Sequence, residues 1–297
     1  MKNSNLSKKI DFIGIGFPKS ATSYIADLIM QHPMLHIPKQ KEMWYFFEKD
    51  KLHIFSEIPK NKNYSMEWYL NHFNYSDKNL LNGEFTPTYI YDIGALKKIK
   101  KYFPNIKVLI SIRNPVEMIY SQFNYFLGSV VDNTDEDFSL IFQDEKYNSL
   151  IEMGNIGTHL KNVYEIFDAK NVIVLFHEDI KRNPLKEIQK FYSFLNVDSI
   201  FEPIVDFQYN ESRIYRYKKI KILANSLYKG INNSNLTFLK GIFFNNLTHK
   251  IYHAINTKKY KFKPLDEKSK QKLIEIYLNE INEVEKIFNI DLKHWKK

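Results

Sequence analysis

A short apolar run that turns abruptly into an amphipathic helix constrains this chain more than any other feature. The run Phe12–Gly16 is bounded by turn residues and is too short for a helix, which predicts a buried strand. Polar residues follow, and from about Thr22 onward the apolar side chains recur at helical spacing. The sequence therefore predicts a strand, a compact loop and a helix over residues 11–31.

The loop between this strand and helix has the composition of an anion site. A helix leaves its first backbone N–H groups unpaired, and its dipole adds partial positive charge at the same end. Gly16 lets the backbone come close to a ligand, Lys19 supplies a full charge, and Ser20, Thr22 and Ser23 supply hydroxyl donors. We interpret the loop as a phosphate site. The alternative is an ordinary turn with a solvated lysine, because the Walker pattern GxxxxGK[ST] is absent.

Composition bounds the class of protein. The chain has 297 residues, of which 44% are hydrophobic, so we expect a packed globular protein. Its net charge of +9 suits an anionic ligand, a polyanion or a membrane surface without choosing among them. It has no cysteine, which excludes disulfides and thiolate chemistry. We see neither a signal peptide nor a transmembrane run, and we expect a cytoplasmic protein.

Further apolar strands and amphipathic helices alternate along the chain. This order predicts an α/β fold in which helices flank a central parallel sheet. The expected strands are 106–112 and 171–176, with an extended segment at 34–38, and the expected helices are 66–73, 92–102, 116–126, 156–167 and 185–195. Asn114 is the expected N-cap of the helix that begins near Pro115.

The remaining segments complete a single predicted domain over residues 1–297. Residues 1–210 form its α/β core, and residues 211–297 form a helical C-terminal portion, with helices over 222–260 and 266–288. The acidic stretch 127–153 is expected to be a surface excursion. The aromatic block after Glu42 is expected to be core.

Three polar features are expected at the carboxyl ends of strands, where open α/β sheets bind ligands. They are the Lys19 loop, Glu84 after the turn glycine Gly83, and Arg113 followed by Ser121 on the next helix. Two phosphate sites beside a carboxylate suggest a nucleotide with phosphates at two positions, which donates a group to a hydroxyl that Glu84 deprotonates.

Each of these assignments has an alternative. Glu84 could pair with a surface lysine, Arg113 could pair with Glu117 on the following helix, and Ser121 could be a packing residue. The basic residues near Arg213 could form a solvated face.

Several segments carry a family resemblance in the right order over nearly the whole chain. They are GIGFPKSATSYI, KEMWYFF, GEFTPTY, IRNPVEMIYSQFNYF, VLFHEDI with FLNV, and IDLKHW. The chain resembles sulfotransferases that use 3′-phosphoadenosine 5′-phosphosulfate (PAPS), most closely the bacterial and heparan-sulfate-type carbohydrate sulfotransferases. The resemblance implies a P-loop-like sheet, PAPS as sulfuryl donor, no metal, and a hydroxyl acceptor that we expect to be a glycan.

The resemblance also implies residue roles. Glu84 would be the general base, Lys19 would stabilise the bridging oxygen of the leaving phosphate, and Lys41 and Glu42 would border the acceptor. The residues implied in donor binding are Pro18, Lys19, Ser20, Ala21, Thr22, Ser23, Arg113, Ser121, Arg213 and Arg216.

Two positions depart from the family pattern. Ala21 stands where the loop usually has glycine, which is a penalty if its φ is positive. Phe85 replaces a basic or polar residue, which suggests a less acidic acceptor than heparan sulfate.

Two other function classes stay open at this point. A P-loop nucleotide kinase is disfavoured by the missing Walker glycine and by the lack of a clear magnesium-binding aspartate. A protein that binds nucleic acid or another anionic polymer could use the basic region 213–263 without being an enzyme. The leading interpretation involves neither nucleic acid nor an integral membrane segment, and it leaves the oligomeric state open.

Overall fold

The computed structural model describes residues 8–39, 42–47, 64–128, 136–205, 213–215, 223, 226–227, 255–260 and 262–297. The chain divides into two compact units. The first draws on residues 1–122, 139–207 and 266–297, and the second on residues 123–138 and 208–265.

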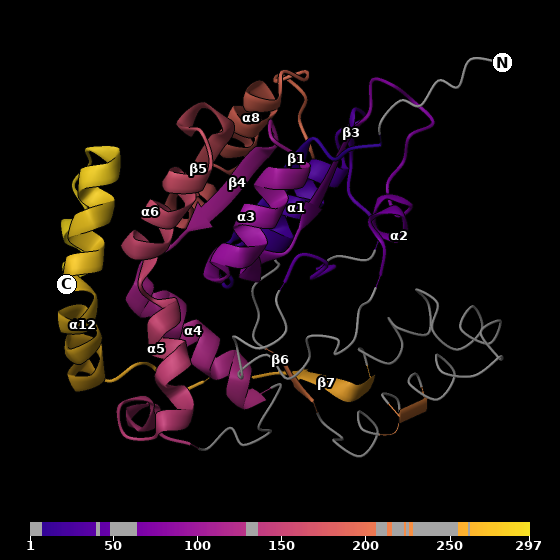
Figure 1. The fold of residues 1–297 in the computed structure, drawn as a ribbon. Coiled ribbons are helices and arrows are strands. Elements are labelled where there is room, and N and C mark those ends of the chain that lie inside the picture. Colours follow the sequence, from indigo (N-terminus) through magenta and orange to yellow (C-terminus); the bar gives the residue numbers. More distant parts are fainter. Residues whose placement is uncertain are drawn as a thin grey trace, which may run out of the picture. The chain divides into compact units, whose positions relative to one another are not determined.

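A five-stranded parallel sheet forms the centre of the first unit (Figure 1). The strand order is β2-β3-β1-β4-β5, so β1 is central and later strands lie on both sides of it. That order places the end of β1 at a switch point, where parallel α/β sheets open a crevice for ligands. The α/β class expected from the sequence is thereby confirmed. The strands are β1 (Phe12–Gly16), β2 (Leu35–His36), β3 (Leu81–Phe85), β4 (Lys107–Ile112) and β5 (Val172–Phe176).

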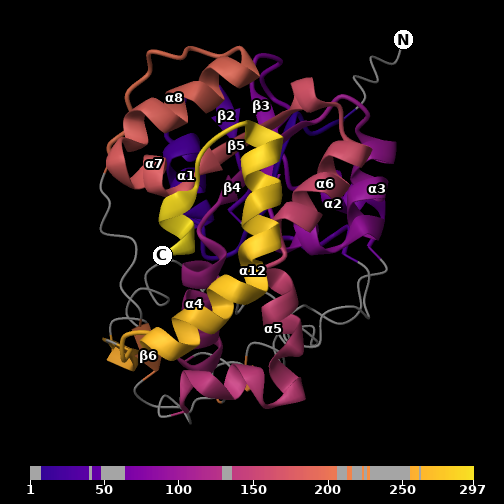
Figure 2. The same cartoon turned by 90° about the vertical axis from the view of Figure 1, so that its left-hand side faces the viewer.

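Helices cover both faces of this sheet (Figure 2). On one face α1 (Thr22–Met30) and α8 (Pro184–Leu195) share a buried core with Phe12, Leu109 and Leu175 of the strands. On the other face α3 and α6 pack together, and α12 packs against α6. The bounds of these three helices are Ile93–Tyr102, Ile156–Ile166 and Glu267–Phe288.

Further helices and 3-10 turns complete the described elements. The helices are α2 (Met66–Leu70), α4 (Pro115–Phe126), α5 (Asn148–Met153) and α7 (His177–Arg182), and the 3-10 turns are η1 (Pro87–Tyr91), η3 (Phe138–Phe142), η4 (Glu145–Tyr147), η5 (Ala169–Asn171) and η7 (Lys293–Lys296). In the second unit, β6 (Arg213–Tyr215) pairs antiparallel with β7 (Thr257–Lys259).

Three expectations from the sequence are wrong. Gly83 lies within β3 rather than in a turn, paired with Phe12 of β1. The position requires glycine because a Cβ there would lie 2.2 Å from the Phe12 ring. The stretch 127–153 is not a plain surface excursion, since Ile141 and Leu150 are fully buried. Residues 257–259 form a strand rather than a helix. The rest of the predicted helical region 222–260 lies largely outside the described residues.

The described residues contain neither a candidate membrane span nor a candidate metal cluster. None of their helices is long and apolar enough to cross a bilayer. No group of three or more acidic or histidine side chains among them is placed to hold a metal ion.

Candidate functional site

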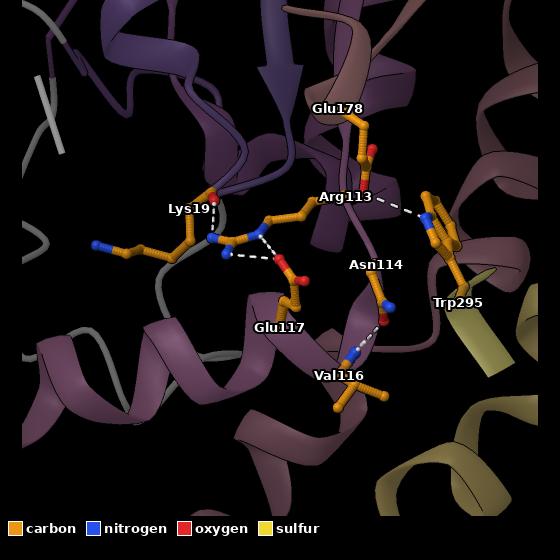
Figure 3. A network of polar contacts seen from close by, with 7 residues as sticks. All are labelled: Lys19, Arg113, Asn114, Val116, Glu117, Glu178 and Trp295. Carbon is orange, nitrogen blue, oxygen red and sulfur yellow. Dashed lines mark hydrogen bonds and ion pairs between the residues drawn. The ribbon is translucent and has the colours of Figure 1, made fainter. Parts of the chain in front are cut away.

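The loop that follows β1 is fastened to the end of β4. The Phe17 N–H donates to the Ser111 carbonyl at 2.7 Å, and the Ser111 hydroxyl donates to the Ser20 carbonyl. Arg113, just beyond β4, donates from Nη1 to the Lys19 carbonyl at 3.2 Å (Figure 3). The carbonyls of the loop therefore face β4.

The backbone N–H groups of Ser20 and Ala21 consequently face away from β4. In a trans peptide the N–H points opposite to the preceding C=O, so the N–H groups of Ser20 and Ala21 point away from Ser111 and Arg113. Lys19 and Ala21 both have positive φ, 63° and 65°, on either side of Ser20, which does not. This alternation is typical of the anion-binding nests that successive N–H groups form.

The first turn of α1 adds to this site. Its N-cap, Ala21, offers no side-chain cap, so the helix N-terminus depends on another partner for its first N–H groups. The Ser20 hydroxyl is fully buried and has no hydrogen-bond partner among the described residues. A buried hydroxyl is costly to leave unpaired. A phosphate oxygen would satisfy it, so the loop residues fit the phosphate of the expected donor.

The surroundings of Lys19 disfavour its positive charge. Its side chain is half-buried and extends away from Arg113 in Figure 3. Burial, with a further contribution from the Arg113 charge, lowers the pKa of Lys19 to about 8, against an opposing effect of Glu42. A cation whose charge is disfavoured by burial and by a neighbouring arginine indicates a site for an anion.

Arg113 makes the contact with Glu117 that the sequence left open as an alternative. Its Nε and Nη2 donate to one oxygen of Glu117 at 3.1 and 2.8 Å. Ser121 lies one helical turn beyond Glu117 on α4 and is half-buried, so it shares the face of α4 that holds Arg113. The predicted cap is confirmed: the Asn114 side chain accepts from the Val116 N–H at 3.0 Å.

Glu84 is deeply buried within β3. It pairs in register with Ile13, is 1% exposed, and accepts a hydrogen bond from the Thr86 hydroxyl at 3.1 Å. Two buried phenols, Tyr69 and Tyr89, lie beside it, and burial followed by the Glu84 charge raises the pKa of both well above the usual value.

Phe85 does not face the acceptor side, contrary to our interpretation of this departure. Because successive strand residues face opposite sides of a sheet, Phe85 turns away from Glu84 and into the core beneath α1. A Cβ at Gly14 would lie 2.3 Å from its ring. Phe85 therefore says nothing about the charge of the acceptor.

Glu42 is the acidic residue whose charge reaches the phosphate loop. Its backbone N–H donates to the Phe85 carbonyl at 3.0 Å, which fixes it at the end of β3. Its charge acts on Lys19. Sequence reasoning placed Glu42 beside the acceptor and missed this coupling, whose only signal was that both residues belong to matched segments.

The structure thus brings part of the predicted set together. Lys19, Ser20, Ala21, Thr22 and Ser23 share one loop and helix end with Pro18, and Arg113 and Glu42 reach this loop. Arg213 belongs to β6 of the other unit, and Lys41 and Arg216 lie outside the described residues.

Sequence reasoning also missed a support behind Arg113. Glu178, at the start of α7, accepts from the Trp295 ring N–H at 3.2 Å (Figure 3). It also accepts from the backbone N–H of Asn114. His177 is buried, and burial followed by the Arg113 charge lowers its pKa to about 3, so it is neutral near pH 7. The turn that presents Arg113 is thus held from behind by the C-terminal segment.

The chain shares a domain with known proteins. The profile of the sulfotransferase domain matches residues 9–283. Membrane-associated sulfotransferase kil1 of Dictyostelium discoideum is 31% identical over 138 residues, 45% of this chain and 26% of that protein. Carbohydrate sulfotransferase 15 of Homo sapiens is 24% identical over 126 residues, 35% of this chain and 22% of that protein. The chain therefore covers about a quarter of each of these relatives.

A solved structure supports the fold. The crystal structure of a sulfotransferase from Alicyclobacillus acidocaldarius superposes with a TM-score of 0.65 at 17% identity, covering 97% of this chain and 99% of that one. Because the domain profile matches most of its length, the chain belongs to the sulfotransferase family.

Proposed function

We propose that the protein transfers a sulfuryl group from PAPS to a hydroxyl of a carbohydrate or other small acceptor. The observation that carries the proposal is the convergence of Arg113 and Lys19 on one loop, joined by the 3.2 Å contact from Arg113 Nη1 to the Lys19 carbonyl. Ser20, the loop N–H groups and the start of α1 would hold the 5′-phosphate, and Arg113 with Ser121 the 3′-phosphate. When bound, the donor supplies a sulfuryl group already activated by its link to phosphate.

Lys19 is suited to stabilise charge that develops on the leaving oxygen. Group transfer of this kind rests mainly on positioning and on charge stabilisation. Lys19 lies on the loop that would hold the 5′-phosphate, and the neighbouring Arg113 is fixed by two partners. The Lys19 pKa of about 8 leaves this side chain mostly charged at neutral pH.

Two carboxylates are candidates for the base that removes the acceptor proton. The sequence assigns this role to Glu84, and that stays a prediction. The geometry supports Glu42 instead, because it is half-buried at the end of β3 and its charge reaches Lys19, whereas Glu84 is 1% exposed. In this proposal Glu84 positions the end of β3 through Thr86 and the neighbouring phenols.

The other finer expectations are proposals of the same kind. A carbohydrate acceptor is supported by the resemblance to a carbohydrate sulfotransferase. A single sulfotransferase domain is supported by the profile match, which spans both compact units. The cytoplasmic location and the lack of a nucleic-acid partner remain predictions from the sequence.

Glu42→Gln and Glu84→Gln test the assignment of the base. Calorimetric titration with adenosine 3′,5′-bisphosphate measures donor-site binding, and transfer from PAPS to a panel of glycans and small alcohols measures chemistry. We expect Glu42→Gln to bind the bisphosphate like the wild type and to lose transfer by about 100-fold or more. Glu84→Gln should lose thermal stability first, because it leaves the buried phenols with a weaker acceptor.

Opposite results would redirect the proposal. Loss of transfer in a stably folded Glu84→Gln protein, with Glu42→Gln active, would make Glu84 the base. A wild-type protein that ignores the bisphosphate and binds ATP with Mg²⁺ would favour the kinase alternative. Binding of nucleic acid that survives Lys19→Ala would favour the anionic-polymer alternative.

A further inference from the structure

The guanidinium of Arg113 is already occupied on the edge that best recognises an oxyanion. Its Nε and Nη2 groups, which form the side-on edge, donate to one carboxylate oxygen of Glu117 at 3.1 and 2.8 Å (Figure 3). Its Nη1 donates to the Lys19 carbonyl at 3.2 Å. A guanidinium has five N–H donors, so these three contacts leave one on each terminal nitrogen.

An incoming phosphate therefore meets Glu117. Paired side-on contacts are the strong form of arginine recognition, and here Glu117 holds both of them. The alternative end-on approach is compromised because one Nη1 hydrogen serves the loop. The Arg113 side chain is 17% exposed, which limits other directions of approach, whereas Glu117 is 55% exposed and has room to turn into solvent.

The charge of Glu117 matters even after it moves aside. It lies in the first turn of α4, one turn before Ser121, on the face where a second phosphate would be held. A carboxylate so close to a phosphate repels it. The same position also explains Glu117 as an ordinary acid at a helix N-terminus, which would influence only the stability of the fold.

We propose that Glu117 competes with the 3′-phosphate of the nucleotide for Arg113. This inference rests on the proposed function and adds a determinant of specificity to it. Glu117 lowers the affinity for 3′-phosphorylated nucleotides and speeds release of the bisphosphate product, while leaving nucleotides without a 3′-phosphate unaffected. Glu117 keeps the Arg113 side chain ordered until the phosphate replaces it.

Glu117→Gln is the direct test, with adenosine 3′,5′-bisphosphate and adenosine 5′-monophosphate as calorimetric probes. Gln keeps the size of the side chain and removes its charge. We expect affinity for the bisphosphate to rise by about twofold to fivefold, the range that a partly exposed charge pair supports. Affinity for the monophosphate should stay the same.

Three controls separate the contact from general effects. Glu165→Gln removes the same charge from an exposed position on α6 and should change neither affinity. Glu117→Asp keeps the charge but shortens the reach to Arg113, so it should fall between the wild type and Gln. In an Arg113→Ala background, Glu117→Gln should lose most of its effect, since the two residues act through each other.

Each outcome decides between the possibilities. Weaker bisphosphate binding by Glu117→Gln would show that Glu117 orders Arg113 for the phosphate, and would overturn the competition. Equal changes for both nucleotides, or no change in a variant with normal thermal unfolding, would also overturn it. If the wild type does not bind the bisphosphate at all, the proposed function fails and the inference falls with it.

Discussion

Burial and the charge of Arg113 favour the neutral form of Lys19. Its pKa is about 8, lowered from 10.5 by burial and then by Arg113. Between these two values the unfolded chain binds more protons than the folded chain, so the contribution of Lys19 to stability rises with pH over this window. Below pH 8 the folded protein therefore carries a charge that its surroundings disfavour. Bound anions reverse this preference.

Nucleotide binding near pH 8 should consequently be coupled to proton uptake. The unliganded protein is about half protonated at Lys19 there, and an anion at the loop raises the pKa of the lysine. Calorimetry with the bisphosphate in buffers of different ionisation enthalpy measures the uptake, which should shrink below pH 7. Lys19→Arg should bind without uptake, because arginine stays charged throughout. Equal uptake in both proteins would place the titrating group elsewhere.

The candidate site shows what residue patterns can predict. Lys19 and Arg113 were predictable because each follows an apolar strand, and parallel strands end at the same edge of a sheet. The depth of Glu84 was not, since it depends on packing against Tyr69, which belongs to the separate helix α2. The Arg113–Glu117 pair was visible as an i, i+4 spacing, but sequence alone could not weigh it against a ligand.

At the scale of elements, the N-terminus of α1 combines two unfavourable features. Ala21 has a φ of 65°, a left-handed conformation that an alanine Cβ disfavours, and it provides no side-chain cap. The loop keeps this shape because Ser111 and Arg113 hold the carbonyls on either side of the Ser20 N–H. Strain of this kind is common where backbone N–H groups are presented to a ligand.

Ala21→Gly should therefore stabilise the protein. Relief of the left-handed strain exceeds the entropy that glycine adds to the unfolded chain, for a net gain of about 0.5–1 kcal/mol. Ala26→Gly, in the same helix, should instead lose about 1 kcal/mol, because glycine lowers helix propensity. Urea unfolding measures both, and bisphosphate titration should show that Ala21→Gly still binds. A loss of stability in Ala21→Gly would mean that the loop does not hold Ala21 at positive φ.

Helices and strands with a clear local sequence pattern were predicted correctly. A strand that forms because neighbouring strands pair with it was not. The β-branched run before Arg113 and the helix ending at Phe288 were predicted to within one or two residues, because their periodicity is unambiguous. β3 was missed, since its sequence LNGEF is polar and contains glycine. It is a strand because β1 and β2 pair with it on both sides, and no local propensity reports that.

At the scale of the molecule, the C-terminal helix belongs to the same compact unit as the sheet. α12 packs against α6, and its Glu280 caps that helix: the Thr158 N–H and hydroxyl donate to the two carboxylate oxygens at 2.7 and 2.9 Å. The Tyr277 hydroxyl donates to the Ile151 carbonyl at 2.8 Å. The chain order had suggested grouping residues 211–297 together, because sequence proximity conceals that 266–297 return to the first unit.

A substitution at Gly157 tests the packing of α12 against α6 without truncating the protein. It is the second residue of α6, and a Cβ there would lie 2.7 Å from the Glu280 carbonyl oxygen and 2.8 Å from the Glu283 Cβ. Backbone cannot yield as a flexible side chain can, so Gly157→Ala should push the two helices apart. We expect it to lower the free energy of unfolding by about 1–3 kcal/mol, the usual effect of overpacking.

Gly94 provides the matched control, because it is the second residue of α3 and half-buried. Gly94→Ala should be neutral or stabilising by up to about 1 kcal/mol, since alanine favours a helix. Urea unfolding compares the two variants, and a single cooperative transition in both would show that α12 unfolds with the sheet. If Gly157→Ala is as stable as Gly94→Ala, or if α12 melts separately, the C-terminal helix is not seated on α6. The contact of Trp295 with Glu178, behind the Arg113 turn, would then have to be maintained by contacts other than those between α12 and α6.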